Sequence, residues 1–242
     1  MRSSPPLAAL GRALRAAGFR VCGAFHPEPE DAVPPLAHGS AQTLVLVGNA
    51  GPTLWRRIRT SPEATDPHPF DAYTRRVVGE LAHAFGAVPV YPWDGPPWHP
   101  FQRWAKRAEP GLGSSPLGML VHPRFGLWHA YRAALLFPQR LDLPPPRRLA
   151  HPCASCDSRP CLAACPASAL RADGYDVPAC RRFLRGSRDR PCLAIGCLAR
   201  HACPVGRRFA YDPAQAAHHM RAFAEAGPPR EADAAVPRMV SD

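Results

Sequence analysis

The chain has 242 residues, a hydrophobic content of 46% and a formal net charge of +11 at pH 7. That length is enough for one large domain or two small ones, and no apolar run approaches the roughly 20 residues that a membrane-spanning helix needs. The positive charge is mostly arginine and includes no basic block with interleaved aromatic residues. We therefore expect no membrane insertion and no nucleic-acid partner, only an arginine-rich surface in solvent.

The N-terminal segment predicts an amphipathic helix rather than a targeting peptide. Leu7, Leu10 and Leu14 recur at helical spacing. Arg12 and Arg15 interrupt the apolar stretch, and no small-residue cleavage site follows. Without a targeting signal we expect a cytoplasmic protein, in which nine cysteines favour metal ligands over disulfides.

Residues 42–137 alternate between strand-like and helix-like patterns. The run QTLVLVGN, residues 42–49, has the composition of a buried strand. Apolar side chains from Phe70 to Phe85 recur at helical spacing, with Gly86 placed to end the helix. The other expected elements are a strand at 87–93, a helix at 100–110, and strands at 118–123 and 127–137, the last of which also fits a helix. This mixture predicts an α+β domain built on one sheet.

The segment GMLVHPRFGLWHAYRAALLFP, residues 118–138, resembles a motif of the CblC-type cobalamin-processing chaperones. Those proteins carry a closely similar His-Pro-Arg-Phe-Gly-x-Trp run, an arginine four residues later, a strand and a Leu-Pro-Pro exit. Weaker similarity extends over nearly all of residues 1–149. The resemblance implies a flavin-reductase-like, nitroreductase-type fold that holds cobalamin base-off and removes its upper axial ligand. The residues it points to are Gly118, His122, Pro123, Phe125, Gly126 and Trp128 for cobalamin binding and Arg132 for catalysis.

Each of these residue types suits a role beside a corrin ring. Phe125 and Trp128 would offer flat apolar surfaces, and the glycines of the motif would let the backbone approach closely. Arg132 would bind an anion near the upper ligand, such as cyanide or a glutathione carboxylate. His122 fits a hydrogen-bonded structural residue better than a cobalt ligand, because base-off members of the family do not generally use a histidine ligand.

The sequence CASCDSRPCLAACP, residues 153–166, opens a module dense in cysteine. Its spacing is C-x2-C-x4-C-x3-C-P, and a second, looser half also closes in Cys203-Pro204. Two halves of four cysteines resemble a bacterial two-cluster ferredoxin, although the first half has four residues where the standard pattern has two. Structural zinc and a disulfide framework are the alternatives.

In two-cluster ferredoxins the fourth cysteine of each half serves the other cluster. The resemblance therefore implies one 4Fe–4S cluster held by Cys153, Cys156, Cys161 and Cys203, and a second held by Cys165, Cys180, Cys192 and Cys197. The module is also similar to the ferredoxin domain of epoxyqueuosine reductases, which share a step like DVPACRRFL at residues 176–184. Cys22 stands apart and is expected to be a buried small hydrophobic residue.

These patterns divide the chain into a cobalamin-binding module, 1–149, an iron–sulfur module, 150–212, and a C-terminal helix with a disordered tail, 213–242. The function they imply is an oxidoreductase that reduces corrinoid cobalt with electrons from its own clusters and removes the upper ligand by decyanation or dealkylation. The expected partners are cobalamin, an external donor such as ferredoxin, flavodoxin or a flavoprotein reductase, and a cobalamin-dependent client enzyme. The alternatives are an epoxyqueuosine-reductase-like enzyme acting on tRNA and a non-enzymatic corrinoid carrier or activator.

Overall fold

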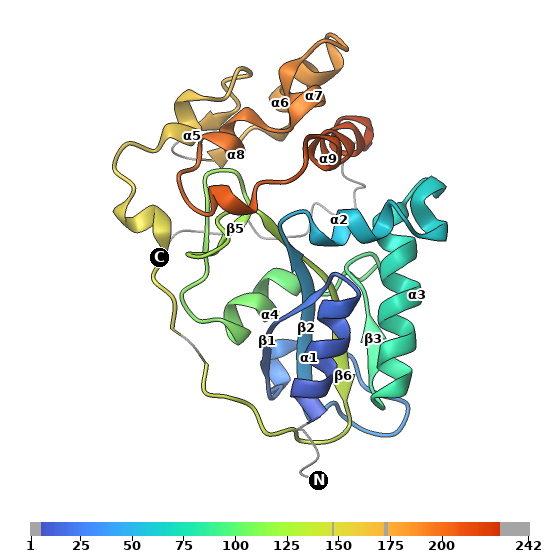
Figure 1. Ribbon diagram of the computed structural model, residues 1–242. Helices are drawn as coiled ribbons and strands as arrows, with labels where there is room; N and C mark the ends of the chain where they lie inside the picture. The colour runs from blue at the N-terminus through green and yellow to red at the C-terminus, as the bar shows by residue number, and fades with distance from the viewer. Residues whose placement is uncertain (1–5, 147, 172–173, 228–242) are drawn as a thin grey trace.

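The structure is a computed structural model that describes residues 6–146, 148–171 and 174–227 (Figure 1). It has a four-stranded antiparallel sheet with helices on its faces, and a smaller part above it made of short helices and turns. The coarse expectation of an α+β protein is therefore confirmed. Among the described helices none is both long enough and apolar enough to cross a membrane. The expected disordered tail, from residue 228 onward, lies outside the described residues.

The main sheet has the strand order β1-β2-β6-β3. Its strands are β1 (Arg20–Phe25), β2 (Thr43–Ala50), β3 (Val88–Val90) and β6 (His129–Phe137). Strands β2 and β6 are central and pair along their whole length, from Thr43 opposite Phe137 to Ala50 opposite His129. The segment that also fitted a helix is thus a strand, because its apolar residues meet cover on both sides of the sheet.

Each face of this sheet carries its own hydrophobic core. Val45, Val47 and Leu135 point to the face covered by α1 (Pro6–Ala16) and α3 (Pro69–Ala84). Leu44, Leu46 and Leu136 point to the opposite face, where α4 (Phe101–Ala108) packs. Burial on both faces explains why β2 reads as a continuous apolar run rather than an alternating one.

The long helix α3 ends as its sequence predicts. Gly86 has φ +67°, and its N–H donates to the carbonyl of His83, while the N–H of Ala87 donates to the carbonyl of Ala82 over 2.8 Å. This pair of bonds is a Schellman ending, which favours glycine because of the left-handed backbone. A shorter helix, α2 (Thr53–Ile58), was missed from the sequence; it links β2 to the turn η2 (Pro62–Thr65).

Before β6 the chain forms a small hairpin of β4 (Gly113–Ser114) and β5 (Leu120–Val121). The strand expected at 118–123 is therefore only two residues long, and the motif continues as a turn in which His122 and Gly126 form an isolated bridge. After β6 the described residues of the proline-rich linker have no regular secondary structure, and they run back along the outside of the molecule toward the upper part (Figure 1).

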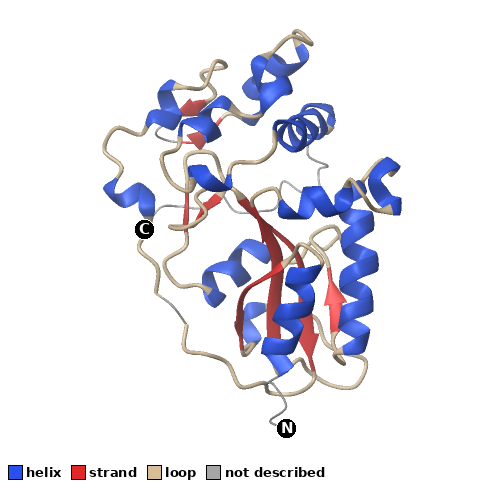
Figure 2. Cartoon of the chain, in the orientation of Figure 1, coloured by secondary structure: helices blue, strands red, loops and turns tan. Residues whose placement is uncertain are grey.

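The cysteine-rich part is built from short helices, turns and one pair of strands of two residues each (Figure 2). Its elements are η3 (Pro152–Ser155), α5 (Pro160–Ala163), β7 (Leu170–Arg171), β8 (Gly174–Tyr175), α6 (Val177–Arg185), α7 (Pro191–Ile195), α8 (Leu198–Ala202) and η4 (Arg207–Phe209). The last helix, α9 (Pro213–Glu225), contacts α6 and α7 and also reaches the first module, where His219 lies 4.6 Å from Phe70 between ring centroids.

Candidate functional site

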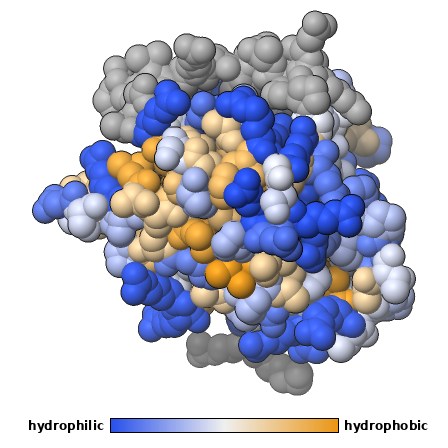
Figure 3. Space-filling view, turned by 90° about the horizontal axis from the view of Figure 1, so that it is seen from above, coloured by the Kyte–Doolittle hydropathy of each residue, from blue (hydrophilic) through white to orange (hydrophobic). Residues whose placement is uncertain are grey.

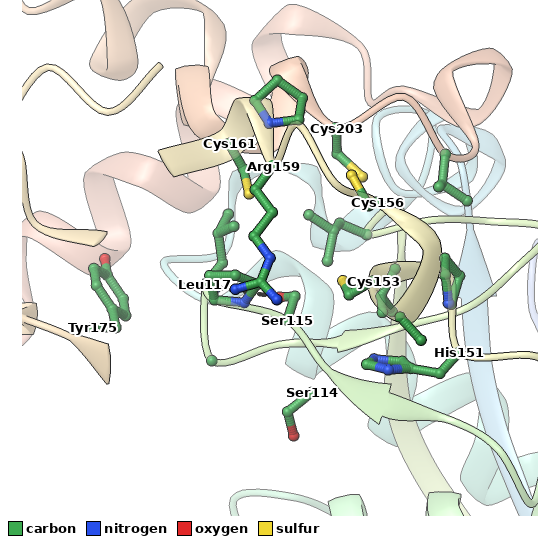
Figure 4. A pocket seen from close by; sticks show the side chains of 18 of the residues that line it. Ser114, Ser115, Leu117, His151, Cys153, Cys156, Arg159, Cys161, Tyr175 and Cys203 are labelled. Atoms are coloured by element: carbon green, nitrogen blue, oxygen red, sulfur yellow. Dashed lines mark hydrogen bonds between the residues drawn. The ribbon is translucent and has the colours of Figure 1, made fainter. Parts of the chain in front are cut away.

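A cavity of about 700 Å³ lies between the hairpin β4–β5 and the cysteine-rich part. Four cysteines line it, and they come from segments about 40 residues apart in the chain: Cys153, Cys156, Cys161 and Cys203. Figure 4 shows these side chains arranged around one space, with His151 at one side of it and Tyr175 at the other. This is the set that the ferredoxin-like spacing implies for one cluster.

Local geometry explains how the four side chains converge. Arg159 has φ +35°, a left-handed turn that reverses the chain before Pro160 begins α5. Cys203 follows α8 in an extended conformation, φ −60° and ψ 124°, which the next residue, Pro204, favours. Helices α5 and α8 pack against each other, so the end of α8 brings Cys203 to the loop that carries the first three cysteines.

The electrostatics of this cavity disfavour free thiolates. Burial raises the pKa of Cys153, and the neighbouring Cys203, Cys161 and Cys156 raise it further. Burial and then Cys203 raise the pKa of Cys161 in the same way. Gathered thiolates repel one another unless a cation neutralises them, and soft sulfur ligands suit iron–sulfur clusters and zinc. The donor set and the size of the cavity therefore fit a cluster, although among the described residues no three such side chains lie close enough to hold a single metal ion.

The other four cysteines form a second, more buried group. They are Cys165, Cys180, Cys192 and Cys197, and they pack around Leu184 and Ala169 or beside α8. Burial raises the pKa of Cys197 to about 11, and the nearby Cys192 and Cys180 add to the shift. Soft sulfur ligands are therefore gathered here as well, in the set implied for the second cluster.

One tyrosine lies between the two cysteine groups, and it was missed from the sequence. Tyr175 lines the large cavity, and it also packs against the apolar cluster that contains Cys180 of the second group. Its ring stacks on Phe223 of α9, with centroids 6.5 Å apart. A lone tyrosine carries no sequence signal, because only the fold brings it beside both groups.

His122 holds the turn of the motif together. Its Nδ1 accepts hydrogen bonds from the backbone N–H groups of Arg124, at 2.9 Å, and Phe125, at 3.3 Å. Its Nε2 lies 3.7 Å from a carboxylate oxygen of Glu109. Both ring nitrogens thus face protein groups, as expected of a structural histidine. Pro123 is half-buried in the same turn, whereas Gly118 is exposed and lines the cysteine cavity.

The aromatic residues of the motif are covered in this structure. Phe125 is 4% exposed and Trp128 is 1% exposed. Trp128 packs against Tyr211 and His201, and Phe125 packs against Phe209, so the segment after Cys203 lies over both rings. A corrin would contact these rings only after that segment moves.

The backbone at Gly126 is closely approached by another part of the chain rather than by a corrin ring. A Cβ atom at this position would lie 2.0 Å from the carbonyl oxygen of Val205, and its φ is +57°. A Cβ on Gly206 would likewise lie 2.3 Å from the backbone of Phe125. The two glycines let the motif and the chain after Cys203 touch backbone to backbone, so this contact accounts for Gly126 without a corrin.

Arg132 lies half-buried under α9 in a seam of polar groups. Its Nε donates to Oδ1 of Asn49 over 3.0 Å, and its guanidinium lies 4.5 Å from the ring centre of Phe70. Burial lowers the pKa of Arg132. Burial of His219, together with the positive charge of Arg132, lowers the pKa of His219 to about 2. Several buried polar atoms of the seam have no hydrogen-bond partner in the protein: Asn49 Nδ2, Trp55 Nε1, Trp128 Nε1, Arg200 Nε, the side-chain oxygen and nitrogen of Gln215, and His219 Nε2. Buried polar atoms of this kind are ordinarily satisfied by ordered water.

The aromatic residues from Tyr91 to Trp104, which reach into α4, are mainly core. Trp104 is fully buried and its Nε1 donates to the carbonyl of Asp31 over 2.8 Å, while Phe101 packs beside it. Trp93 stacks on Tyr91 with centroids 5.0 Å apart. Packing therefore accounts for the rings of Trp93, Phe101 and Trp104.

No family model matches the chain, and no curated protein matches it in sequence. Its structure is similar to that of epoxyqueuosine reductase from Streptococcus thermophilus, with a TM-score of 0.50 and 18% identity over 86% of this chain and 69% of the other. Two further likenesses have TM-scores of 0.49, too low to add an argument. One is to an epoxyqueuosine reductase with an epoxyqueuosine-modified tRNA-Tyr stem loop, at 19% identity over 86% of this chain and 69% of the other. The other is to the C. elegans B12-trafficking protein CblC, at 12% identity over 91% and 93%.

At 18% identity the similarity to the Streptococcus thermophilus reductase shows a shared fold only, so the chemistry has to be argued from the residues of the site. The chain has the α+β fold of that reductase, with cysteine groups gathered at one end of it.

Proposed function

We propose that this chain is an oxidoreductase that reduces the cobalt of a bound corrinoid and expels its upper axial ligand. The observation that carries the proposal is the shared cavity, because four cysteines form one side of it and residues of the first module, including Gly118 and Leu127, form the other. The cysteines that would hold an electron-carrying cluster and the residues that resemble a cobalamin-binding protein thus face the same space.

The cysteines would hold two 4Fe–4S clusters in the sets described above. Such clusters store and pass single electrons. The chain would supply eight thiol ligands and cationic side chains such as Arg159 beside the first set. An external donor, such as ferredoxin, flavodoxin or a flavoprotein reductase, would provide the electrons.

The substrate in this proposal is the corrinoid. A cobalt(III) corrinoid that gains an electron binds its axial ligands less strongly, so cyanide leaves with the bonding electron pair. Arg132, with its desolvated guanidinium, would stabilise the anion as it leaves. For a corrinoid to reach Arg132 and Trp128, the segment from Val205 to α9 has to swing aside.

A visible absorption spectrum tests the proposal. The protein is reconstituted anaerobically with iron and sulfide, reduced, freed of excess reductant and mixed with cyanocobalamin. We expect the cobalt bands to pass to the base-off reduced form while the cluster absorbance recovers. A cobalamin spectrum identical to that of the free cofactor would contradict the proposal. Binding without a change in oxidation state would instead identify a corrinoid carrier.

An epoxyqueuosine-reductase-like activity on tRNA is the second candidate. It is favoured by the structural likeness at TM-score 0.50 and by the net charge of +11. A gel-shift titration with tRNA separates the candidates, because binding driven by phosphate contacts weakens steeply as salt increases. Tight, salt-dependent tRNA binding together with epoxyqueuosine reduction would favour this second function.

The domain boundaries belong to the same proposal. We infer a corrinoid module at 1–149 and an iron–sulfur module at 150–212, joined by the extended linker. Helix α9 bridges the two, since it contacts α7 on one side and Phe70 on the other.

A further inference from the structure

A second groove, of about 630 Å³, lies on the cysteine-rich part away from the large cavity. It is formed by α6, the turn that follows α6, α7 and α9, and α9 packs against both other helices (Figure 1). Apolar side chains form its floor and arginines form its rim. The groove has no part in the site described above.

The floor of the groove lies against the second cysteine group. Leu184, Leu193 and Ala224 line the groove, and they also pack in the apolar cluster that contains Cys180 and Cys192. Leu193 directly follows Cys192 in α7. A single layer of side chains therefore separates this part of the surface from the second group.

The first cysteine group faces the other way, into the large cavity shared with the first module. The two groups adjoin, because Cys165 packs in both of the apolar clusters that contain cysteines. The fold thus places the groove, the second group, the first group and the large cavity in a continuous order. An electron that enters at the groove would pass both groups before it reaches the cavity.

The rim of the groove is strongly basic. The run RRFLRGSRDR, residues 181–190, contains five arginines and one carboxylate. From this run Arg185 and Arg188 line the groove, and Arg221 joins them from α9, with Glu225 as the one carboxylate of the lining. Within the described parts of the chain none of these three arginines takes part in an ion pair. Their positive charge is therefore available to a partner.

These features fit a protein partner better than a nucleic acid. Interfaces between proteins have an apolar centre and a polar rim, and those of electron carriers are small and transient. Ile195 of α7 is 45% exposed and extends the apolar surface beside Ala194 of the floor. No aromatic ring is among the described residues of the lining, so bases would have nothing to stack on.

We propose that this groove is the docking site of a small acidic protein that carries single electrons. The inference rests on the second cluster of the proposed function, but not on corrinoid binding. In the transfer the carrier loses one electron and the second cluster gains it, and no bond forms or breaks. Opposite charges on the two surfaces would speed their encounter, and salt would slow it.

The test is the double variant Arg188→Glu, Arg221→Glu. Both side chains are exposed, whereas Arg185 also donates to the carbonyls of Ala224 and Ala226 and so holds the end of α9. The reconstituted protein is mixed anaerobically with flavodoxin whose flavin is fully reduced, and oxidation of the flavin is followed by stopped-flow absorbance. We expect a second-order rate constant at least about tenfold below that of wild type in about 10 mM salt, and a smaller difference in about 500 mM salt.

Two further double variants are the controls. Arg12→Glu with Arg140→Glu changes the net charge equally at exposed positions of the first module, and it should keep the wild-type rate to within about twofold because salt screens distant charges. Arg188→Lys with Arg221→Lys keeps the charge and should also keep the rate. All variants should match wild type in iron content and in the extent of reduction by excess dithionite.

Calorimetric titration of the oxidised protein with oxidised flavodoxin measures docking without regard to the potentials. We expect binding that weakens with salt and is lost in the groove variant. Unchanged affinity and rate in that variant, an equal loss in the first-module control, or a wild type that neither binds flavodoxin nor reacts with it would overturn this inference alone. Weaker binding of tRNA with unchanged binding of flavodoxin would also overturn it and identify a nucleic-acid surface. A wild-type chain that takes up no iron would overturn the cluster proposal as well.

Discussion

At the scale of single residues, Cys203 tests how the cysteines are shared. It lies far along the chain from Cys153, Cys156 and Cys161 but lines the same cavity. We expect Cys203→Ser to bind about half the iron of wild type after reconstitution, because one of two clusters loses a ligand. Iron analysis and the loss of one paramagnetic signal are the measurements.

The matched control is Cys22→Ala. Cys22 is buried in the first module beside Arg20, with its pKa raised by burial to about 12, and it lies outside the cysteine cavity. This variant should keep the iron content of wild type. If Cys203→Ser keeps all its iron and Cys22→Ala loses some, the ligand sets are wrong.

Gly126 allows a prediction that separates fold from cofactor binding. In Gly126→Ala the new Cβ would overlap the carbonyl oxygen of Val205, so we expect the free energy of unfolding to fall by about 2 kcal/mol or more, even without any cofactor. Gly86→Ala is the control: its φ is also positive, +67°, but nothing lies within 4 Å of its Cβ, so about 1 kcal/mol should be lost. Equal losses in urea unfolding would show that the Val205 contact is unimportant.

At the scale of elements, helix α9 should respond to acid. Burial and the charges of Arg132 and Arg200 lower the pKa of His219 to about 2. Burial and Arg221 also lower the pKa of His218, and the carboxylate of Asp71 opposes that shift. Both rings are therefore favoured as neutral groups while α9 is docked. Their stabilising effect is complete above the free histidine pKa of about 6.5 and shrinks as the pH falls below it.

Hydrogen exchange of α9 at pH 7.5 and pH 5, corrected for intrinsic rates, measures this effect. We expect opening of α9 to rise by up to about tenfold per pH unit below 6.5 for each of the two histidines. Peptides of α3 away from Phe70 serve as the internal reference, and His219→Leu should show a weaker pH dependence. Equal protection of α9 at both pH values would mean that its histidines do not control docking.

The sequence predicts elements well where a local rule decides them. The strand at 42–49 and the helix from Phe70 ended by Gly86 follow from composition, periodicity or glycine chemistry. The run 127–137 fits both a strand and a helix, and pairing with β2 makes it a strand. The strand expected at 118–123 shrank to β5 because His122 accepts two backbone hydrogen bonds and pulls the chain into a turn. No spacing rule reports such a side-chain contact.

The candidate site, too, could be predicted from the sequence only in part. The resemblance to two-cluster ferredoxins implies that Cys203 joins Cys153, Cys156 and Cys161, and these four cysteines line one cavity. The contacts of Trp128 with Tyr211, and of Gly126 with Val205, join parts of the chain about 80 residues apart. Such contacts depend on how the two modules meet, which no pattern within either module encodes.

At the scale of the whole molecule, the two modules differ in how they are held together. The sheet has a large apolar core on each face, whereas the cysteine-rich part buries few large side chains, among them Leu170 and Leu184, and has short helices joined by turns. The face seen in Figure 3 carries an apolar area surrounded by hydrophilic residues. A module with so small a core needs cross-links or a bound metal group to stay folded.

Removal of iron should therefore unfold the molecule in part. We expect exchange of backbone amides in the described parts of 150–212 to increase by at least about tenfold when a chelator strips the loaded protein, while β2 and β6 keep their protection. Mass spectrometry of the loaded, stripped and reloaded protein is the measurement, and reloading should restore the original pattern. Equal protection with and without iron would mean that the clusters do not stabilise this module, and a loss of protection throughout the sheet would mean that the modules fold as one unit.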